Sequence, residues 1–157
     1  MRKINWKRLI ICIAIPLAVG GLSALLTRGS MDIFETVNKP PLSPPAWLFP
    51  VVWTLLYVLM GIASYLVLEA KADREETEKA LYLYGIQLAV TFFWPVLFFS
   101  LQRFGFAFVW LVLLWVLILW TLLRFYRIHK TAGYLLIPYL VWVTFAGYLN
   151  FGIWLLN

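Results

Sequence analysis

The chain has 157 residues, of which 64% are hydrophobic and only 13% are charged, and its formal net charge is +6. Because about 25% of the residues in a soluble domain are charged, this composition excludes a soluble enzyme, a disordered tail and a disulfide-rich secreted module. A single cysteine, Cys12, and a single histidine, His129, permit neither an internal disulfide nor a metal site built from these side chains. No metal and no resident cofactor are therefore expected, and the remaining class is a small membrane protein.

Five stretches of the chain are apolar enough to cross a bilayer as helices, for which about 20 residues each are needed. Their hydrophobic residues form continuous runs, which favours helices over the alternating strands of a membrane barrel. The sequence therefore predicts an all-α, polytopic membrane protein, with residues 1–157 forming a single domain, a bundle of five transmembrane helices. The predicted helices cover residues 9–26, 47–68, 80–101, 106–123 and 133–156, with an outer loop at 27–46.

The distribution of lysine and arginine predicts the orientation of the bundle. Ten of the 13 basic residues fall on one side of the predicted spans: Arg2, Lys3, Lys7, Arg8, Lys71, Arg74, Lys79, Arg124, Arg127 and Lys130. Because basic residues collect in cytoplasmic segments, we expect a cytoplasmic N-terminus and a C-terminus outside the cell. The positive charge thus reports topology and contact with anionic membrane lipid, and no nucleic-acid partner is needed to explain it.

The segments between the predicted helices differ in character. Residues 69–79 are rich in charge and predict a solvated connector that extends a helix, and residues 124–132 predict a second loop on the same side. The outer loop contains four prolines, which fix extended and turn conformations: Pro40, Pro41, Pro44 and Pro45. An ordered loop of about 20 residues is often a functional lid, so we expect this loop to cover a site.

Three of the predicted helices each present one face of mixed aromatic and polar residues. Spacings of three and four place such residues on one side of a helix: Trp53, Tyr57, Gly61 and Ser64; Gln87, Thr91 and Trp94; and Trp142, Ala146 and Asn150. The three faces predict one cavity in the outer half of the membrane, below the proline-containing loop, for a flat, largely apolar ligand. The alternative is that the polar residues only bridge neighbouring helices and that the tryptophans pack in the core.

A pair of small residues in the third predicted helix suggests a contact between two copies of the chain. Gly85 and Ala89 are four residues apart and lie on the side opposite Gln87. Small residues at this spacing let helices approach closely, which predicts a homodimer interface; close packing within one chain is the alternative. Gly20 and Ala24 in the first helix give a weaker signal of the same kind.

Three blocks of sequence carry a resemblance to a known family. They are Asn-Lys-Pro-Pro-Leu-Ser-Pro-Pro-Ala-Trp-Leu-Phe-Pro-Val-Val-Trp (38–53), Gln-Leu-Ala-Val-Thr-Phe-Phe-Trp-Pro (87–95) and Leu-Ile-Pro-Tyr-Leu-Val-Trp-Val-Thr-Phe-Ala-Gly-Tyr-Leu-Asn-Phe (136–151). In this order and at these separations, they resemble the TspO/MBR family, the translocator proteins or tryptophan-rich sensory proteins, in its bacterial form. The similarity spans nearly the whole chain from the first helix onward.

The resemblance implies a five-helix bundle, commonly dimeric, in a bacterial cell membrane, with a pocket for porphyrins under the first loop. It also implies that Trp53 and Trp142 match the two tryptophans implicated in light- and oxygen-dependent breakdown of protoporphyrin IX, and that Ala146 matches a pocket alanine. The chain departs from the family pattern at Thr91, where an asparagine is common, and at Leu42, where a tryptophan is common. These departures bear on drug affinity and porphyrin selectivity.

Together, the sequence and the resemblance lead to three functional hypotheses. The first is a membrane protein that binds protoporphyrin IX or another flat apolar molecule in porphyrin handling, transport or stress sensing. The second is light-dependent degradation of protoporphyrin IX, with Trp53 and Trp142 as the photo-oxidative residues. The third is a ligand-gated scaffold or receptor for a partner protein. The expected ligand-binding residues are Trp53, Tyr57, Gln87, Thr91, Trp94, Trp142, Ala146 and Asn150.

Overall fold

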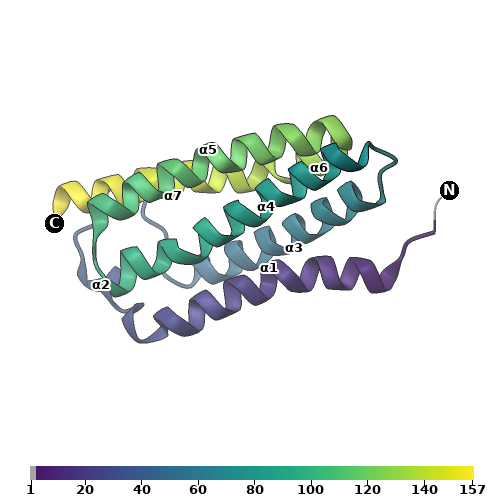
Figure 1. The fold of residues 1–157 in the computed structure, drawn as a ribbon. Helices are drawn as coiled ribbons and strands as arrows, with labels where there is room; N and C mark the ends of the chain where they lie inside the picture. The colour runs from purple at the N-terminus through teal and green to yellow at the C-terminus, as the bar shows by residue number, and fades with distance from the viewer. Residues whose placement is uncertain (1–2) are drawn as a thin grey trace.

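The computed structural model describes residues 3–157, which are helical over most of their length (Figure 1). Arg2, one of the basic residues behind the predicted orientation, lies outside the described residues. The predicted all-α bundle is confirmed, because five stretches are long and apolar enough to cross a membrane: Trp6–Ser30, Leu48–Glu69, Arg74–Ser100, Phe104–Ile128 and Lys130–Leu156. The two ends of the chain lie at opposite ends of the bundle (Figure 1), as an odd number of spans requires.

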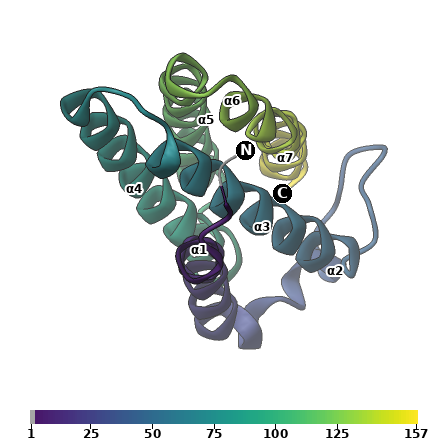
Figure 2. The same cartoon turned by 90° about the vertical axis from the view of Figure 1, so that its right-hand side faces the viewer.

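The long helices are α1 (Trp6–Thr27), α3 (Leu48–Glu69), α4 (Arg74–Pro95), α5 (Phe104–Ile128) and α7 (Ile137–Leu156). The first loop contains the 3-10 turn η1 (Arg28–Ser30) and the short helix α2 (Ile33–Thr36). A π-helical turn, η2 (Val96–Ser100), continues α4, and α6 (Lys130–Leu135) precedes α7. In the view along the bundle (Figure 2), α1 packs against α3 and α4, α4 against α5, and α5 against α7.

Two connecting segments are shorter than the sequence predicted. The helix predicted to begin at residue 80 begins at Arg74, because charged side chains one turn apart support its first turns. The ion pairs are Arg74 Nε to Glu78 Oε1, 3.0 Å, and Lys79 Nζ to Glu75 Oε1, 3.1 Å. The predicted loop 124–132 is also mostly helical, since α5 continues to Ile128 and α6 begins at Lys130.

Gly61 in α3 sets the closest approach between α1 and α3. A Cβ atom on this residue would lie 2.7 Å from the carbonyl oxygen of Cys12 and 2.9 Å from the backbone nitrogen of Ile13. Real Cβ atoms essentially never come this close to backbone atoms, so only glycine fits here without moving α1. At this level, therefore, the two helices touch through their backbones.

The first loop is fastened to the C-terminal end of α7. The backbone N–H of Asn38 donates to Oδ1 of Asn157 (3.1 Å), and Nδ2 of Asn157 donates to the carbonyl oxygen of Asn38 (2.8 Å). The Tyr148 hydroxyl donates to the carbonyl oxygen of Pro41 (2.6 Å). The proline-containing part of the loop is thereby held against α7.

Replacing Gly61 with alanine is expected to lower the free energy of unfolding by about 1–3 kcal/mol, because the added methyl group overlaps the backbone of α1. This loss should outweigh the gain of about 1 kcal/mol in helix propensity. Gly147→Ala is the matched control, since the nearest atom to a Cβ there is Cδ2 of Leu111, at 3.9 Å. Thermal unfolding of the detergent-solubilised protein measures both effects. Equal melting temperatures for the two variants would contradict the assignment of Gly61 as a backbone contact.

Candidate functional site

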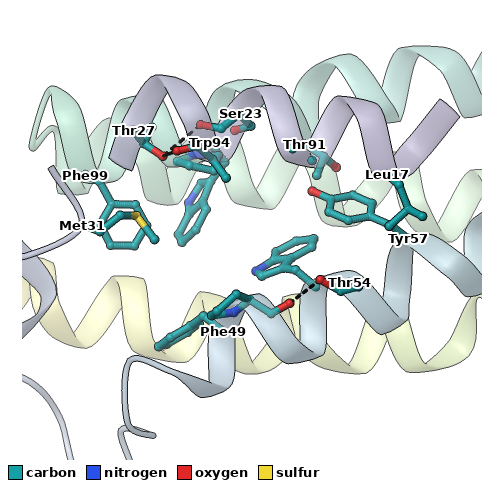
Figure 3. A pocket seen from close by; sticks show the side chains of 16 residues that line it. Leu17, Ser23, Thr27, Met31, Phe49, Thr54, Tyr57, Thr91, Trp94 and Phe99 are labelled. Atoms are coloured by element: carbon teal, nitrogen blue, oxygen red, sulfur yellow. Dashed lines mark hydrogen bonds between the residues drawn. The ribbon is translucent and has the colours of Figure 1, made fainter. Parts of the chain in front are cut away.

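A cavity of about 240 Å³ lies between α1, α3 and α4 (Figure 3). Small side chains from α1 form one wall and aromatic side chains from α3 form the facing one, while α4, η2 and the beginning of the first loop complete the cavity. The lining residues are Leu17, Gly20, Gly21, Ser23, Ala24, Thr27, Met31, Phe49, Pro50, Trp53, Thr54, Tyr57, Thr91, Trp94, Pro95 and Phe99. Four of the predicted ligand-binding residues, Trp53, Tyr57, Thr91 and Trp94, are among them.

The aromatic wall is built around Trp53 and Tyr57, which lie one turn apart on α3. Their rings are stacked, with centroids 5.6 Å apart and planes inclined by 30°. Neither the indole N–H of Trp53 nor the hydroxyl of Tyr57 has a hydrogen-bond partner among residues 3–157. The wall therefore presents ring faces for stacking and two donors for a polar group on a ligand.

The wall formed by α1 was not predicted from the sequence. Gly20 faces Tyr57, and a Cβ atom on it would lie 2.7 Å from Cδ2 of that ring, so glycine makes room for the tyrosine. Gly21 and Ala24 line the cavity on its exposed side. The run of small residues was the available signal, but the spacing of Gly20 and Ala24 predicts only a close contact between helices.

Three hydroxyl groups in the cavity wall, those of Ser23, Thr27 and Thr54, already donate hydrogen bonds within the protein. Ser23 Oγ donates to the carbonyl oxygen of Phe92 (2.8 Å), and Thr27 Oγ1 donates to that of Ser23 (2.9 Å). Thr54 Oγ1 donates to the carbonyl oxygen of Pro50 (2.7 Å), a bond drawn in Figure 3. These three side chains consequently offer a ligand only their acceptor lone pairs.

Two of the predicted ligand-binding residues link α4 to α7 and do not line the main cavity. The hydroxyls of Thr91 and Tyr139 are hydrogen-bonded, and the Tyr139 hydroxyl donates to Oε1 of Gln87 (2.7 Å). The indole N–H of Trp94 donates to Oδ1 of Asn150 (3.0 Å). For Gln87 and Asn150 the alternative interpretation of the sequence, bridging between helices, therefore describes their contacts in this structure.

The expectation that α7 shares the main cavity is corrected by the position of Phe49. Ala146 and Asn150 line a separate space of only about 10 Å³, and three aromatic residues, Phe49, Trp94 and Phe99, border both this space and the main cavity. Trp142 lies behind the ring of Phe49, with centroids 5.7 Å apart, and Phe49 also meets Phe34 of α2 edge-on at 4.9 Å. Trp142 Nε1 is buried and has no hydrogen-bond partner within the described part of the chain.

The proline-containing part of the first loop does not cover the cavity as predicted. Among residues 27–46, Thr27 and Met31 line it, and none of the four prolines does. The physical reason is the pairing of Asn38 with Asn157, which holds the middle of the loop on the end of α7.

The predicted dimer interface lies on the outer surface of α4. Gly85 and Ala89 are both exposed. Within the described residues, no atom of another helix lies within 4 Å of the position that a Cβ would take on Gly85. Close packing at Gly85 within one chain is thus ruled out for the described residues, and contact with a second copy stays a prediction.

The composition of the cavity wall is suited to binding by stacking and apolar contact. None of its lining residues is Asp, Glu, His, Lys, Arg or Cys. The described residues also contain no group of three or more His, Cys, Asp and Glu side chains arranged to hold a metal ion. The wall therefore offers aromatic faces and a few hydrogen-bonding groups, and no side chain for acid–base work at neutral pH.

Comparisons with known proteins agree with the resemblance noted in the sequence. Residues 12–155 match the profile of the TspO/MBR family. The tryptophan-rich protein TspO of Chlorobaculum tepidum is 42% identical to this chain over 95% of both proteins. Protein CrtK of Rhodobacter capsulatus is 36% identical over 88% of this chain and 85% of its own length, and the translocator protein of Bos taurus is 36% identical over 89% and 84%.

The Tyr139→Phe variant is expected to lose about 1–3 kcal/mol of stability, because it leaves two buried groups, Thr91 and Gln87, without their common partner. These residues are only 2% and 1% exposed, respectively. Tyr82→Phe is the control, since Tyr82 is 75% exposed. Denaturant or thermal unfolding in detergent gives the comparison, and a Tyr139→Phe protein as stable as Tyr82→Phe would show that the buried network contributes nothing.

Proposed function

The chain is a multi-pass membrane protein that belongs to the TspO/MBR family, and from this membership and the cavity we propose that it binds a tetrapyrrole such as protoporphyrin IX between α1, α3 and α4. One observation carries the proposal: stacked Trp53 and Tyr57, with both donors unpaired among the described residues, line a cavity whose facing wall on α1 consists of small side chains apart from Leu17. A flat ligand fits between a wall of rings and a wall without bulky groups.

The polar groups of the cavity suit the polar groups of a porphyrin. Trp53 and Tyr57 contribute stacking to the face of the macrocycle, and their N–H and O–H donors lie at the edges of these rings, where they reach polar groups at the rim of the ligand. The two carboxylates of protoporphyrin IX lie at the end of the cavity near Thr27. Arg28, which follows Thr27 directly and is exposed, supplies a positive charge at that end.

The position of the cavity supports entry of the ligand from the membrane. Gly21 and Ala24 on α1 and Pro50 and Thr54 on α3 line the cavity and are also exposed on the surface of the bundle. The opening therefore lies along the side of two membrane-spanning helices and not only at their ends. An apolar pigment dissolved in the bilayer reaches the aromatic wall by this route.

Binding of a porphyrin requires the cavity to widen. Its volume of about 240 Å³ lies below the range of about 300–1,000 Å³ typical of small-molecule sites, and a porphyrin is a large ligand. Phe49 borders both this cavity and the space beside Ala146, and Phe34 packs against Phe49 from the first loop. Rotation of Phe49 joins the two spaces and brings Ala146 and Trp142 to the ligand, which accounts for the α7 residues expected from the sequence.

Filling the cavity is expected to weaken binding without disturbing the fold. The Ala24→Phe variant places a ring in the cavity from an exposed position, and we expect it to weaken protoporphyrin IX binding in the dark by at least about tenfold. Leu25→Phe is the matched control, because Leu25 is exposed on the same helix and does not line the cavity. Pigment fluorescence titrated with purified protein gives the affinities. Wild-type affinity in Ala24→Phe would place the pigment elsewhere.

Light-dependent degradation is the second candidate function, and the location of Trp53 in the cavity wall, stacked on Tyr57, favours it. If the wall takes part in the reaction, Trp53→Phe should slow the formation of a new pigment product under illumination. Trp142→Phe should slow it as well, because the rotation of Phe49 that admits the pigment uncovers the Trp142 ring with which Phe49 is in contact. Absorption spectra recorded during illumination measure both rates at equal pigment occupancy. Equal rates in wild type and Trp53→Phe would leave binding as the function and rule out this chemistry at Trp53.

A further inference from the structure

A groove of about 550 Å³ lies on the outside of the bundle between α4 and α5, separate from the ligand cavity. The two helices are antiparallel, so its lining changes in order along its length. Lys79 and Arg124 lie at one end, Tyr82 and Trp120 in the middle, and Ile86 and Leu117 at the other end. At about 1.5 Å per residue, the distance from Lys79 to Ile86 along α4 is about 10 Å.

The order of these side chains matches the layers of a membrane surface. Tyr82 is 75% exposed and Trp120 is 51% exposed, and such residues collect where the headgroups meet the hydrocarbon. Ile86 and Leu117 then lie at the depth of the acyl chains, and Lys79 and Arg124 lie at the depth of the phosphates. The groove therefore extends from the depth of the acyl chains, at Ile86 and Leu117, to the depth of the phosphate groups, at Lys79 and Arg124.

The charged end of the groove has an uncompensated positive charge. Arg124 forms no ion pair among residues 3–157. Lys79 pairs with Glu75, but their side chains are 64% and 73% exposed, and such surface pairs contribute little and exchange readily. Glu78, the other acidic residue of the groove, pairs with Arg74. Basic residues outnumber acidic ones at this end of the bundle, which is the end predicted to face the cytoplasm.

We propose that this groove is a binding site for one anionic phospholipid of the membrane. The phosphate binds Arg124 and, by exchange with Glu75, Lys79; an acyl chain lies along Leu83, Ile86 and Leu117. Charge complementarity identifies the occupant, because anionic lipids are attracted to basic grooves between membrane helices on the cytoplasmic side. The site is independent of the pigment cavity.

The alternative occupant is a second copy of the chain. Tyr82 and Ile86 are on the same side of α4 as Gly85 and Ala89, so the groove borders the predicted dimer interface. A second copy would cover the apolar residues, but the charged end of its own groove carries Glu75 and Glu78 as well as Lys79 and Arg124, so it offers Arg124 no net negative charge. The lipid is therefore favoured over the second copy.

The test is native mass spectrometry of the full chain released from membranes that contain equal amounts of phosphatidylglycerol and phosphatidylcholine with identical acyl chains. Wild type should retain mainly phosphatidylglycerol, and Arg124→Gln should lower the ratio of retained phosphatidylglycerol to phosphatidylcholine by about fivefold. Arg127→Gln is the matched control, because Arg127 is exposed on the same helix and does not line the groove. Leu117→Trp keeps both charges and fills the apolar part, so it should reduce retention of either lipid.

Three results would overturn the proposal. Equal retention of the two lipids by wild type would remove the anionic preference. An equal fall in the ratio of retained phosphatidylglycerol to phosphatidylcholine in Arg124→Gln and Arg127→Gln would mean that anionic lipid is attracted to the basic surface in general and not bound in the groove. Loss of dimers in Leu117→Trp with unchanged lipid retention would assign the groove to a second copy. Melting temperatures in detergent identify any variant that fails to fold. If one of the two groove variants, Arg124→Gln or Leu117→Trp, does not fold, lipid retention by the other one tests the proposal.

Discussion

The backbone contact between α1 and α3 at Gly61 is the constraint on which the cavity depends. There the two helices are as close as backbones allow, because Gly61 of α3 lies against the backbone of Cys12 and Ile13 in α1. One turn of α3 away, the ring of Tyr57 lies against Gly20 and holds the helices further apart. Beyond that ring, α1 continues with small residues that cannot fill the space opposite Trp53. The cavity thus lies between α1 and α3 where the two helices are further apart, beyond their backbone contact at Gly61 and beside the aromatic rings of α3.

The rest of the bundle keeps this gap from collapsing and limits its size. The hydroxyl of Tyr139 ties α4 to α7 through Thr91 and Gln87, and in the apolar interior of a membrane protein such bonds replace those that water would make. The first loop is anchored on α7 through Asn38, so its short helix α2 can keep Phe34 packed on Phe49. Ligand access to α7 therefore depends on one aromatic contact and not on the whole loop.

The sequence predicts the number and the nature of the spans well, because membrane helices are defined by length and continuous hydrophobicity. It also identifies Trp53, Tyr57 and Thr91 as residues that line one cavity, since helix geometry fixes which residues share a face of α3 and which share a face of α4. It does not say which helix that face meets, and so it did not predict that the Trp94 indole donates to the amide oxygen of Asn150. Gly20, Gly21 and Ala24 of α1 were not predicted to line a cavity because they carry no polar or aromatic group. The space that these small residues leave can be recognised as a cavity only when the position of α3 on its other side is known.

A structure of the protein with protoporphyrin IX bound tests the central claim most directly. The account predicts density for the macrocycle between α1 and α3, stacked on Trp53, with the ring of Phe49 rotated so that the pigment reaches Ala146. Gly61 should remain in contact with the backbone of α1, because the gap opens at the other end of the two helices. Pigment bound on another face of the bundle, with Trp53 and Tyr57 still stacked beside an unfilled cavity, would contradict the account.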